Sequence, residues 1–268
     1  MKIASWNVNS LNVRLPHLKQ WLAAARPDVV ALQETKLEDA RFPDGEIAAM
    51  GYRSVFSGQK TYNGVAILSR MDAPGGGAIG DVQVGIPGFG DEQKRVLAAT
   101  VNGVRIVDVY VVNGQAVGSD KYAYKLRWLD ALHAWLSNEI ARHPRLVLLG
   151  DFNIAPDERD VHDPAYWNEA RILTSRAERD ALDRLHALGL HDAFRALNPD
   201  SREFSWWDYR QFAFRRNLGL RIDLTLVSEA LRTDCIAAGI DREPRTWERP
   251  SDHAPAWVEL ASAGDRHG

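Results

Sequence analysis

The sequence has little that would indicate a disulfide scaffold, a thiolate metal site or a membrane protein. Cys235 is its only cysteine, which excludes an intramolecular disulfide and a cysteine-based metal cage. No segment approaches the ~20 consecutive apolar residues that span a bilayer, and the chain begins in a strand-like run without a signal-peptide core. The formal net charge of −3 provides no global attraction to nucleic acid, so such a signal has to be local. We expect a cytoplasmic protein that does not associate with membranes.

Short apolar runs suited to buried strands recur along the chain and alternate with helical patterns. The runs cover residues 3–6, 29–32, 64–68, 96–101, 104–112, 146–149, 222–227 and 256–260. Helical stripes cover residues 15–25, with Pro16 in the first turn, and residues 126–140 and 175–188, the last opening with a Ser175-x-x-Glu178 capping box and ending at Gly189. No linker divides the chain. This pattern predicts one α/β domain with mixed sheets over residues 1–260, followed by a short tail at 261–268.

Polar side chains follow several apolar runs at the point where each run ends. Asn7 follows the first run and Glu34 the second, while Gly150 and then Asp151 and Asn153 follow a later one. By the two-residue period of an extended chain, Asp151 and Asn153 share one side. A carboxylate can bind a hard cation or accept a proton from water, and an amide can donate to a phosphate oxygen. Taken singly, the Asp151/Asn153 motif is equally well explained by an Asx turn, and Glu34 by a charge in a first helical turn. Asn7 taken singly is better explained as a turn residue.

The run 104–112 carries Tyr110 and is followed by Asn113. A strand tyrosine usually belongs to the core, but its phenol would matter if it faced a phosphate or a leaving oxygen. Asn113 can donate to a phosphate, although Asn113-Gly114 is also an ordinary turn signal.

The pair Asp252-His253 lies just before the last apolar run and is the most informative feature of the chain. Its carboxylate suits a hard cation, and its imidazole can hydrogen-bond an anionic oxygen beside that cation. Asp223 lies inside another apolar run, where a buried carboxylate needs a partner. His253 is the expected partner, because a carboxylate orients an imidazole and favours its charged form.

A nucleic-acid signal is confined to one segment that mixes arginine with aromatic residues. Its members include Arg202, Trp206, Trp207, Arg210, Arg215, Arg216 and Arg221. Basic groups can follow a phosphate backbone while aromatic rings stack on bases. A solvated arginine loop beside core aromatics is the alternative. Lys60, Tyr62 and Asn63 form a second candidate phosphate-contacting loop.

With these residues in order, the chain resembles the exonuclease III family of bacterial DNA-repair nucleases, within the endonuclease/exonuclease/phosphatase group. The matching motifs are Trp6-Asn7-Val8-Asn9-Ser10, Leu32-Gln33-Glu34-Thr35-Lys36, Gly150-Asp151-Phe152-Asn153-Ile154-Ala155-Pro156, Gly219-Leu220-Arg221-Ile222-Asp223 and Ser251-Asp252-His253-Ala254-Pro255. They run in family order over nearly the whole chain. The resemblance implies an α/β sandwich of two facing mixed β-sheets flanked by helices, with the site at one edge.

The resemblance also implies hydrolysis of DNA phosphodiesters with Mg²⁺ or Mn²⁺. Glu34 would be the principal metal ligand, with Asn7, Asp151, Asn153 and Asp252 contributing. Asp151 would orient or deprotonate the attacking water, and Asn153 would hold the scissile phosphate. His253, paired with Asp223, would bind a phosphoryl oxygen, and Tyr110 would contact the phosphate or assist the leaving 3′ oxygen. Residues that would contact DNA are Lys60, Tyr62, Asn63, Asn113, Trp206, Trp207, Arg210, Arg215, Arg216 and Leu220.

Two positions depart from the family pattern. Val112 stands where relatives commonly have proline, and Glu169 replaces the glycine of a Trp-x-Gly segment. If that segment borders the DNA pocket, Glu169 puts accommodation of a flipped abasic sugar in doubt and favours work at 3′ ends.

The expected activity is abasic-site cleavage, 3′→5′ digestion of duplex DNA, or both, by a monomer acting in base excision repair. The alternatives are a phosphodiesterase acting on a lipid headgroup or another small phosphate ester, and a catalytically inert DNA-binding module.

Overall fold

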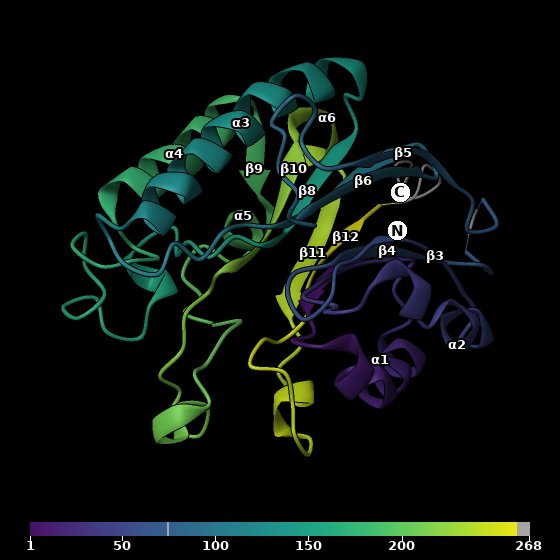
Figure 1. Ribbon diagram of the computed structural model, residues 1–268, viewed down its shortest axis with the longest axis horizontal. Coiled ribbons are helices and arrows are strands. Elements are labelled where there is room, and N and C mark those ends of the chain that lie inside the picture. Colours follow the sequence, from purple (N-terminus) through teal and green to yellow (C-terminus); the bar gives the residue numbers. More distant parts are fainter. Residues whose placement is uncertain (74, 262–268) are drawn as a thin grey trace.

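The computed structural model describes residues 1–73 and 75–261 and contains two six-stranded mixed sheets (Figure 1). In spatial order, the first sheet contains β11 (Cys235–Ile240), β12 (Ala256–Leu260), β1 (Lys2–Asn7), β2 (Val29–Gln33), β4 (Val65–Arg70) and β3 (Tyr52–Ser57). The second contains β5 (Ile79–Val84), β6 (Val96–Val101), β7 (Val104–Tyr110), β8 (Leu146–Asp151), β10 (Asp223–Ser228) and β9 (Leu190–Asp192). The α-helices are α1 (Leu11–Ala25), α2 (Asp44–Ala49), α3 (Asp120–Arg142), α4 (Arg176–Ala187), α5 (Ala193–Leu197) and α6 (Glu229–Arg232), and short 3₁₀ turns cover Asp39–Arg41, Glu158–Asp160, Arg210–Phe212 and Glu243–Thr246.

The two sheets pack face to face and bury an aliphatic layer between them. Ile3 and Ala31 of the first sheet lie in one buried cluster with Ile106 and Leu149 of the second. Because these strands are covered on both faces, their sequences are mostly apolar. The predicted sandwich of two facing sheets is therefore confirmed.

Helices cover the outer face of each sheet. Leu18 and Leu22 of α1 pack on the first sheet, and Leu132 of α3 and Leu182 of α4 pack on the second. Figure 1 shows α1 and α2 on one side of the molecule and α3 and α4 on the other. The result is a four-layer arrangement of helices, sheet, sheet and helices.

All eight predicted strands are present, and the four that the pattern missed are the four sheet edges. β3, β5, β9 and β11 end the two sheets and carry partly exposed side chains. An edge strand needs no continuous apolar run, so its sequence carries a weaker signal than a central strand.

The helix predictions are confirmed with one correction. Ser175 and Glu178 form the predicted capping box of α4, and Gly189 follows that helix with a φ of 83°. Pro16 does not lie in a first turn, because α1 begins at Leu11 and contains the proline in its interior. There the ring removes one helical hydrogen bond, and the helix tolerates the loss. Among the described residues, no helix has the length and apolar character needed to cross a membrane.

The predicted boundary at residue 260 coincides with the end of β12. The predicted tail at 261–268 lies outside the described residues except for Ala261. The division therefore stays a prediction.

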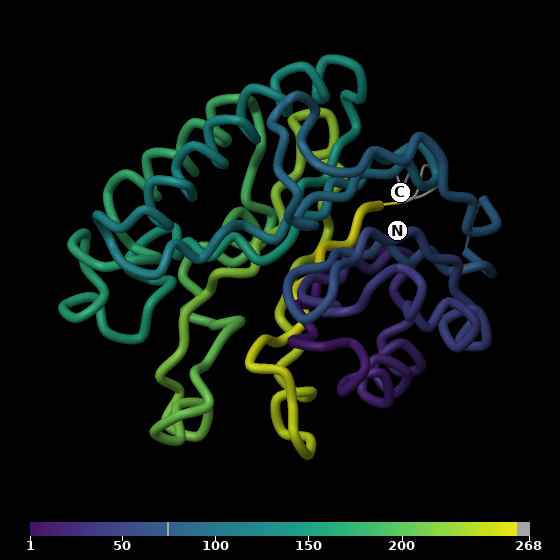
Figure 2. The backbone as a smooth tube through the Cα atoms, in the orientation of Figure 1, coloured from purple at the N-terminus to yellow at the C-terminus, as the bar shows by residue number. Residues whose placement is uncertain are grey.

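Strand direction brings one end of each sheet to a common edge. β1 runs parallel to β2, β7 runs parallel to β8, and β10 and β12 run antiparallel to their neighbours β8 and β1. The C-terminal ends of β1, β2, β7 and β8 therefore meet the N-terminal ends of β10 and β12. Figure 2 shows the chain segments on either side of residue 210 and residue 245 projecting beyond this edge.

Candidate active site

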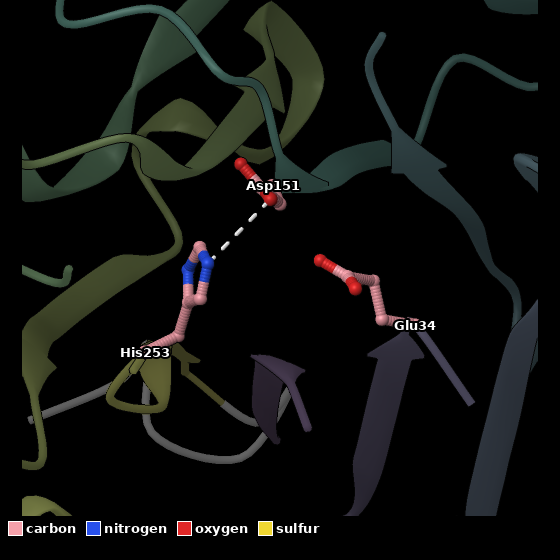
Figure 3. A group of neighbouring side chains, drawn as sticks. All are labelled: Glu34, Asp151 and His253. Carbon is pink, nitrogen blue, oxygen red and sulfur yellow. Dashed lines mark ion pairs between the residues drawn. The ribbon is translucent and has the colours of Figure 1, made fainter. Parts of the chain in front are cut away.

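Each predicted catalytic side chain lies at this common edge. Asn7 and Asp151 end β1 and β8, Glu34 follows β2 by one residue, and Asp223 begins β10. In Figure 3, Glu34, Asp151 and His253 point toward one another from three separate segments of the chain, which lie after β2, at the end of β8 and before β12. Residues separated by more than two hundred positions in the sequence thus share one site.

Glu34 is held in an uncommon backbone conformation, with a φ of 53°. The Glu34 carbonyl accepts the Ser10 N–H at 2.8 Å, and the next residue, Thr35, donates its N–H to the Gly64 carbonyl at 3.1 Å. A Cβ atom at Gly64 would lie 2.1 Å from Thr35 Oγ1, so only glycine permits this approach. Neighbouring strand ends therefore hold the carboxylate in place, as is common for strained residues at functional sites.

Two carboxylates and an imidazole form the centre of the site. Glu34, Asp151 and His253 each offer one ligand atom, and these atoms lie within 4.8 Å of one another. Asn7 Nδ2 donates to Glu34 Oε1 and to Asp151 Oδ2, both at 2.9 Å. Lys36 Nζ lies 2.9 Å from Glu34 Oε2. Carboxylate oxygens without any thiolate suit Mg²⁺ or Mn²⁺, so the residues present fit a hard divalent cation.

His253 is paired with Asp223, as the sequence predicted. His253 Nδ1 lies 2.9 Å from Asp223 Oδ2, and Ser205 Oγ donates to the same oxygen at 2.6 Å. The other ring nitrogen, Nε2, lies 3.7 Å from Asp151 Oδ2. Burial alone would lower the pKa of His253, but the Asp223 and Asp151 carboxylates outweigh it and raise that pKa. The ring is therefore cationic at neutral pH and presents an N–H to the site.

The environment of the site raises the pKa of two other groups, Asp151 and Tyr110. Burial raises the pKa of Asp151, and Asp223 and Glu34 raise it further against the opposing His253 charge. Burial also raises the pKa of Tyr110, reinforced by Glu34 and Asp151. A carboxylate with a raised pKa is a better base, and a phenol with a raised pKa remains a donor.

Asn153 and Asn113 form a connected amide pair beside Asp151. Asn153 Nδ2 donates to the Val111 carbonyl at 3.1 Å and to Asp151 Oδ2 at 3.2 Å. Asn113 Nδ2 donates to Asn153 Oδ1 at 3.1 Å. The two amides are therefore linked to each other and to Asp151, and their predicted contacts with a phosphate stay predictions.

Asp252 is tied into the site indirectly. Its Oδ1 accepts from Asn9 Nδ2 at 2.9 Å, and its Oδ2 accepts from Trp206 Nε1 at 3.0 Å. Asn9 in turn accepts from Lys36 Nζ at 2.6 Å, and Lys36 pairs with Glu34. The predicted ligand roles of Asn7, Glu34, Asp151, Asn153 and Asp252 all stay predictions. In this structure Asn7 directs its amide N–H groups at the Glu34 and Asp151 carboxylates.

Apart from Asn113, which follows β7, the predicted DNA-contacting residues occupy two loops at this edge. Lys60 and Tyr62 are exposed between β3 and β4, whereas Asn63 is buried and donates to Gln59 at 3.1 Å. In the second loop Arg210, Arg215 and Arg216 are exposed. Phe212 between them is 72% exposed, which leaves an aromatic ring available for a base or sugar.

Two residues of the arginine-aromatic segment have packing roles instead. Trp207 is fully buried, in a cluster with Phe204 and other apolar residues, so the predicted DNA contact has no exposed ring surface. Arg221 is also buried and forms ion pairs with Asp160 at 2.6 Å and Asp192 at 2.8 Å. The aromatic and basic composition of the segment therefore reflects both a surface and a core.

A cavity of about 600 Å³ lies next to the centre, and Trp206 links the two. Trp206 forms an isolated β-bridge with His253 and another with Leu220. The cavity is lined by His162, Asp163, Tyr166, Trp167, Trp206, Asp208, Arg210, Gln211, Ala213, Leu218 and Leu220. Leu220, buried from bulk water, forms part of its wall.

The two departures from the family pattern lie away from the three central side chains. Val112 is buried in the core between the second sheet and α3. Glu169 has a side chain that is 60% exposed, lies 3.8 Å from Arg176 and does not line the 600 Å³ cavity.

Sequence reasoning missed several residues that organise the site. Lys36 pairs with Glu34, Asn9 joins Lys36 to Asp252, and Ser205 holds Asp223. Lys36 and Asn9 lie inside matched motifs, which was the available signal. Lys125 was also missed. It is buried in α3, three and four residues before Trp128 and Leu129, so its place on an apolar stripe was the clue.

Comparison with known proteins places this site in a family. The model of the endonuclease/exonuclease/phosphatase family matches residues 4–253. Exodeoxyribonuclease III of Haemophilus influenzae is 33% identical over 97% of this chain and 100% of its own length. The solved structure of the 3′ phosphatase NExo from Neisseria bound to a product DNA hairpin is 48% identical with a TM-score of 0.94, covering 98% of this chain and 100% of that one. An AP endonuclease structure from Archaeoglobus fulgidus is 35% identical with a TM-score of 0.92 and the same coverage. This chain therefore belongs to the endonuclease/exonuclease/phosphatase family, in the group of exodeoxyribonuclease III and its DNA-repair relatives.

Proposed function

We propose that this protein processes the 3′ ends of duplex DNA, by removing 3′ phosphates and 3′ nucleotides, and that cleavage at abasic sites is its second activity. Its class is given by its relatives, which make it a DNA-repair phosphodiester hydrolase. The observation that carries the proposal is the convergence of Glu34, Asp151 and His253 within 4.8 Å. The preference for 3′ ends rests on NExo, which at 48% identity is described as a 3′ phosphatase.

We propose Mg²⁺ or Mn²⁺ as the cofactor. Glu34 and Asp151 would hold the cation, with Asn7, Asn153 and Asp252 as further oxygen ligands, and the bound ion would neutralise phosphate charge. Lys36 offsets the negative charge of Glu34 in this structure at 2.9 Å. Cation binding measured by calorimetry on wild type and Glu34→Gln tests this assignment, and equal affinity in the two proteins contradicts it.

The remaining steps follow from the placement of the other side chains. Asp151 accepts a proton from the attacking water, which its raised pKa permits. Asn153 and Asn113 donate to the non-bridging phosphate oxygens. The cationic His253, held by Asp223 at 2.9 Å, donates to an oxygen on which negative charge grows. Tyr110 donates to the phosphate or to the leaving 3′ oxygen.

Asp151→Asn tests the proposed base. We expect turnover to fall at least ~10²-fold, the lower end of general-base effects. DNA affinity should change by only a few-fold, because the substituted amide keeps the size of the side chain. Turnover within threefold of wild type would remove Asp151 from this role.

Substrate preference requires parallel time courses on three duplexes under identical salt and metal: one with a 3′ phosphate, one with a recessed 3′ end and one with an abasic site. Faster removal of the 3′ phosphate and 3′ nucleotides supports the proposal. Faster abasic incision would reverse the ranking. Identical salt is essential because phosphate contacts make DNA affinity steeply dependent on ionic strength.

The comparisons do not favour a lipid-headgroup phosphodiesterase or an inert DNA-binding module. Cleavage of a soluble phosphodiester, but not of DNA, in the same assay would support the first alternative. Binding of duplex DNA without turnover would support the second. We also propose that the protein acts as a monomer in the cytoplasm. Sedimentation of the protein with and without duplex DNA checks the monomer.

A further inference from the structure

Lys125 is a fully buried lysine beneath the site that no step above uses. It lies in α3 with 0% of its side chain exposed, and it pairs with Glu178 of α4, whose side chain is equally buried. A buried charged pair is costly to form and is weak support for stability as such. Stability alone therefore does not explain the pair, and the contacts of Lys125 with its surroundings point to another role.

The ammonium group of Lys125 contacts the main chain of both amide-bearing loops. Nζ donates to the Asn153 carbonyl at 2.7 Å and to the Asn113 carbonyl at 3.2 Å, and its third contact is Glu178. These are all three donors that an ammonium has. Asn113 follows β7 and Asn153 follows β8, so one side chain ties together the loops after two neighbouring strands.

We propose that Lys125 is a positioning residue, which fixes the Asn113 and Asn153 carbonyls on the helix side so that their side-chain amides face the phosphate. The inference rests on the proposed roles of the two asparagines. Asn113 Nδ2 to Asn153 Oδ1, at 3.1 Å, closes the link on the site side. The two loops are thus joined by the Lys125 ammonium on the side of α3 and by the Asn113–Asn153 side-chain hydrogen bond on the side of the site.

Packing around the lysine stem leaves it little freedom. A Cβ atom on Gly114 would lie 3.1 Å from Lys125 Cδ and 3.0 Å from Ile172 Cδ1, so the loop backbone rests closely on the stem. Glu178 is held as firmly, because its carboxylate accepts from Leu173 N at 3.1 Å and from Ser175 Oγ at 2.6 Å. The site loops are therefore anchored through Lys125 and Glu178 to the beginning of α4.

The test separates loss of the clamp from loss of stability. Lys125→Met leaves Glu178 buried without its cation and lowers the Tm. Adding Glu178→Gln removes the unpaired charge, retains an acceptor for Ser175 and is expected to recover most of that Tm. If Lys125 positions the amides, the double variant still shows kcat at least ~10-fold below wild type, with KM for DNA changed less than threefold, because misplacing catalytic groups affects turnover more than binding.

A second buried pair on the same helix supplies the matched control. Arg105 of β7 and Glu139 of α3 lie 2.6 Å apart with side chains 4% and 3% exposed, and neither contacts the site loops. The double variant Arg105→Met/Glu139→Gln should keep kcat within threefold of wild type even if its Tm is lower. Amide hydrogen exchange at residues 111–115 and 152–154 should quicken only in the Lys125 variants.

The outcome that overturns the inference is a kcat for the Lys125→Met/Glu178→Gln double variant less than tenfold below wild type, or no lower than that of the Arg105→Met/Glu139→Gln protein, each measured well below its own Tm. Asn113→Ala and Asn153→Ala are assayed in parallel. If these two keep full turnover, the proposed roles of the asparagines fail. If they lose turnover while the Lys125 double variant does not, the positioning role alone fails.

Discussion

Gly150, the residue before Asp151, is the position where a single added methyl group should do most damage to the site. It lies in β8 opposite Val109 of β7, with a φ of 146°. A Cβ atom there would lie 1.9 Å from the Val109 carbonyl oxygen and 2.8 Å from its carbon. These are backbone atoms of a central strand, so no side-chain rotation can relieve the overlap in Gly150→Ala.

The size of the effect follows from that overlap. Ordinary contact begins near 3.4 Å, so the two strands have to separate locally by about 1.5 Å, which breaks part of their hydrogen-bond ladder. Overpacking of a core costs about 1–3 kcal/mol, and an alanine in a glycine-only backbone region costs about 1–3 kcal/mol more. We expect the free energy of unfolding to fall by about 2–6 kcal/mol and the Tm to fall by roughly 5–15 °C. Because Asp151 moves with its neighbour, turnover should fall about 10²-fold.

Urea unfolding and kcat on a recessed 3′ end, measured well below the Tm, check both expectations. Gly80→Ala is the control, because Gly80 is also a strand glycine and an added Cβ meets nothing within 4 Å. If Gly150→Ala stays within about 0.5 kcal/mol of the control, which is the range of ordinary surface substitutions, the close-approach argument is refuted. If stability falls but kcat does not, the link from β8 geometry to Asp151 is refuted.

Three further changes follow from the charges of the protein. In Asp223→Asn the pKa of His253 should fall, because the Asp223 carboxylate is the main group that raises this pKa against burial. The alkaline limb of the kcat/KM profile should therefore move to lower pH, and a limb that does not move contradicts the pairing. Burial raises the pKa of Asp108 well above its usual value, and the hydrogen bonds from Gln33 and a backbone N–H oppose this rise. The contribution of Asp108 to the free energy of unfolding is therefore largest below about pH 4, and it is lost as the pH rises toward the pKa of the folded state. Asp108→Asn should therefore gain about 1 kcal/mol or more over wild type between urea unfolding at pH 5 and at pH 8, and a constant difference argues against it. Arg215→Ala should weaken DNA binding and reduce the slope of log K against log salt by about 0.9, whereas an unchanged slope removes Arg215 from the phosphate contacts.

The strands show which part of the fold was readable from sequence. The predicted bounds 96–101 and 256–260 match β6 and β12, because both are interior strands with a mostly apolar sequence. β5 and β11 were not recognised, because edge strands face solvent along part of their length and lose the apolar pattern. Interior strands with a mostly apolar sequence are therefore the ones that sequence alone predicts well.

The arginine-aromatic segment shows where composition misled. Arg215 is exposed as expected, but Arg221 in the same stretch is buried between two aspartates. Trp207 fills the core while its neighbour Trp206 reaches the site. Adjacent residues in extended backbone point to opposite sides, so composition alone could not assign them.

By itself the sequence determined the central strands and the kinds of polar group that end them, because burial and strand periodicity act over a few residues. Only the tertiary structure decided that Asn7 from one sheet would lie 2.9 Å from Asp151 of the other, and that Lys125 would reach the loops of Asn113 and Asn153 from a helix behind them. Those distances depend on how two sheets and a helix layer pack, and no local pattern of residues encodes a spacing between separate layers.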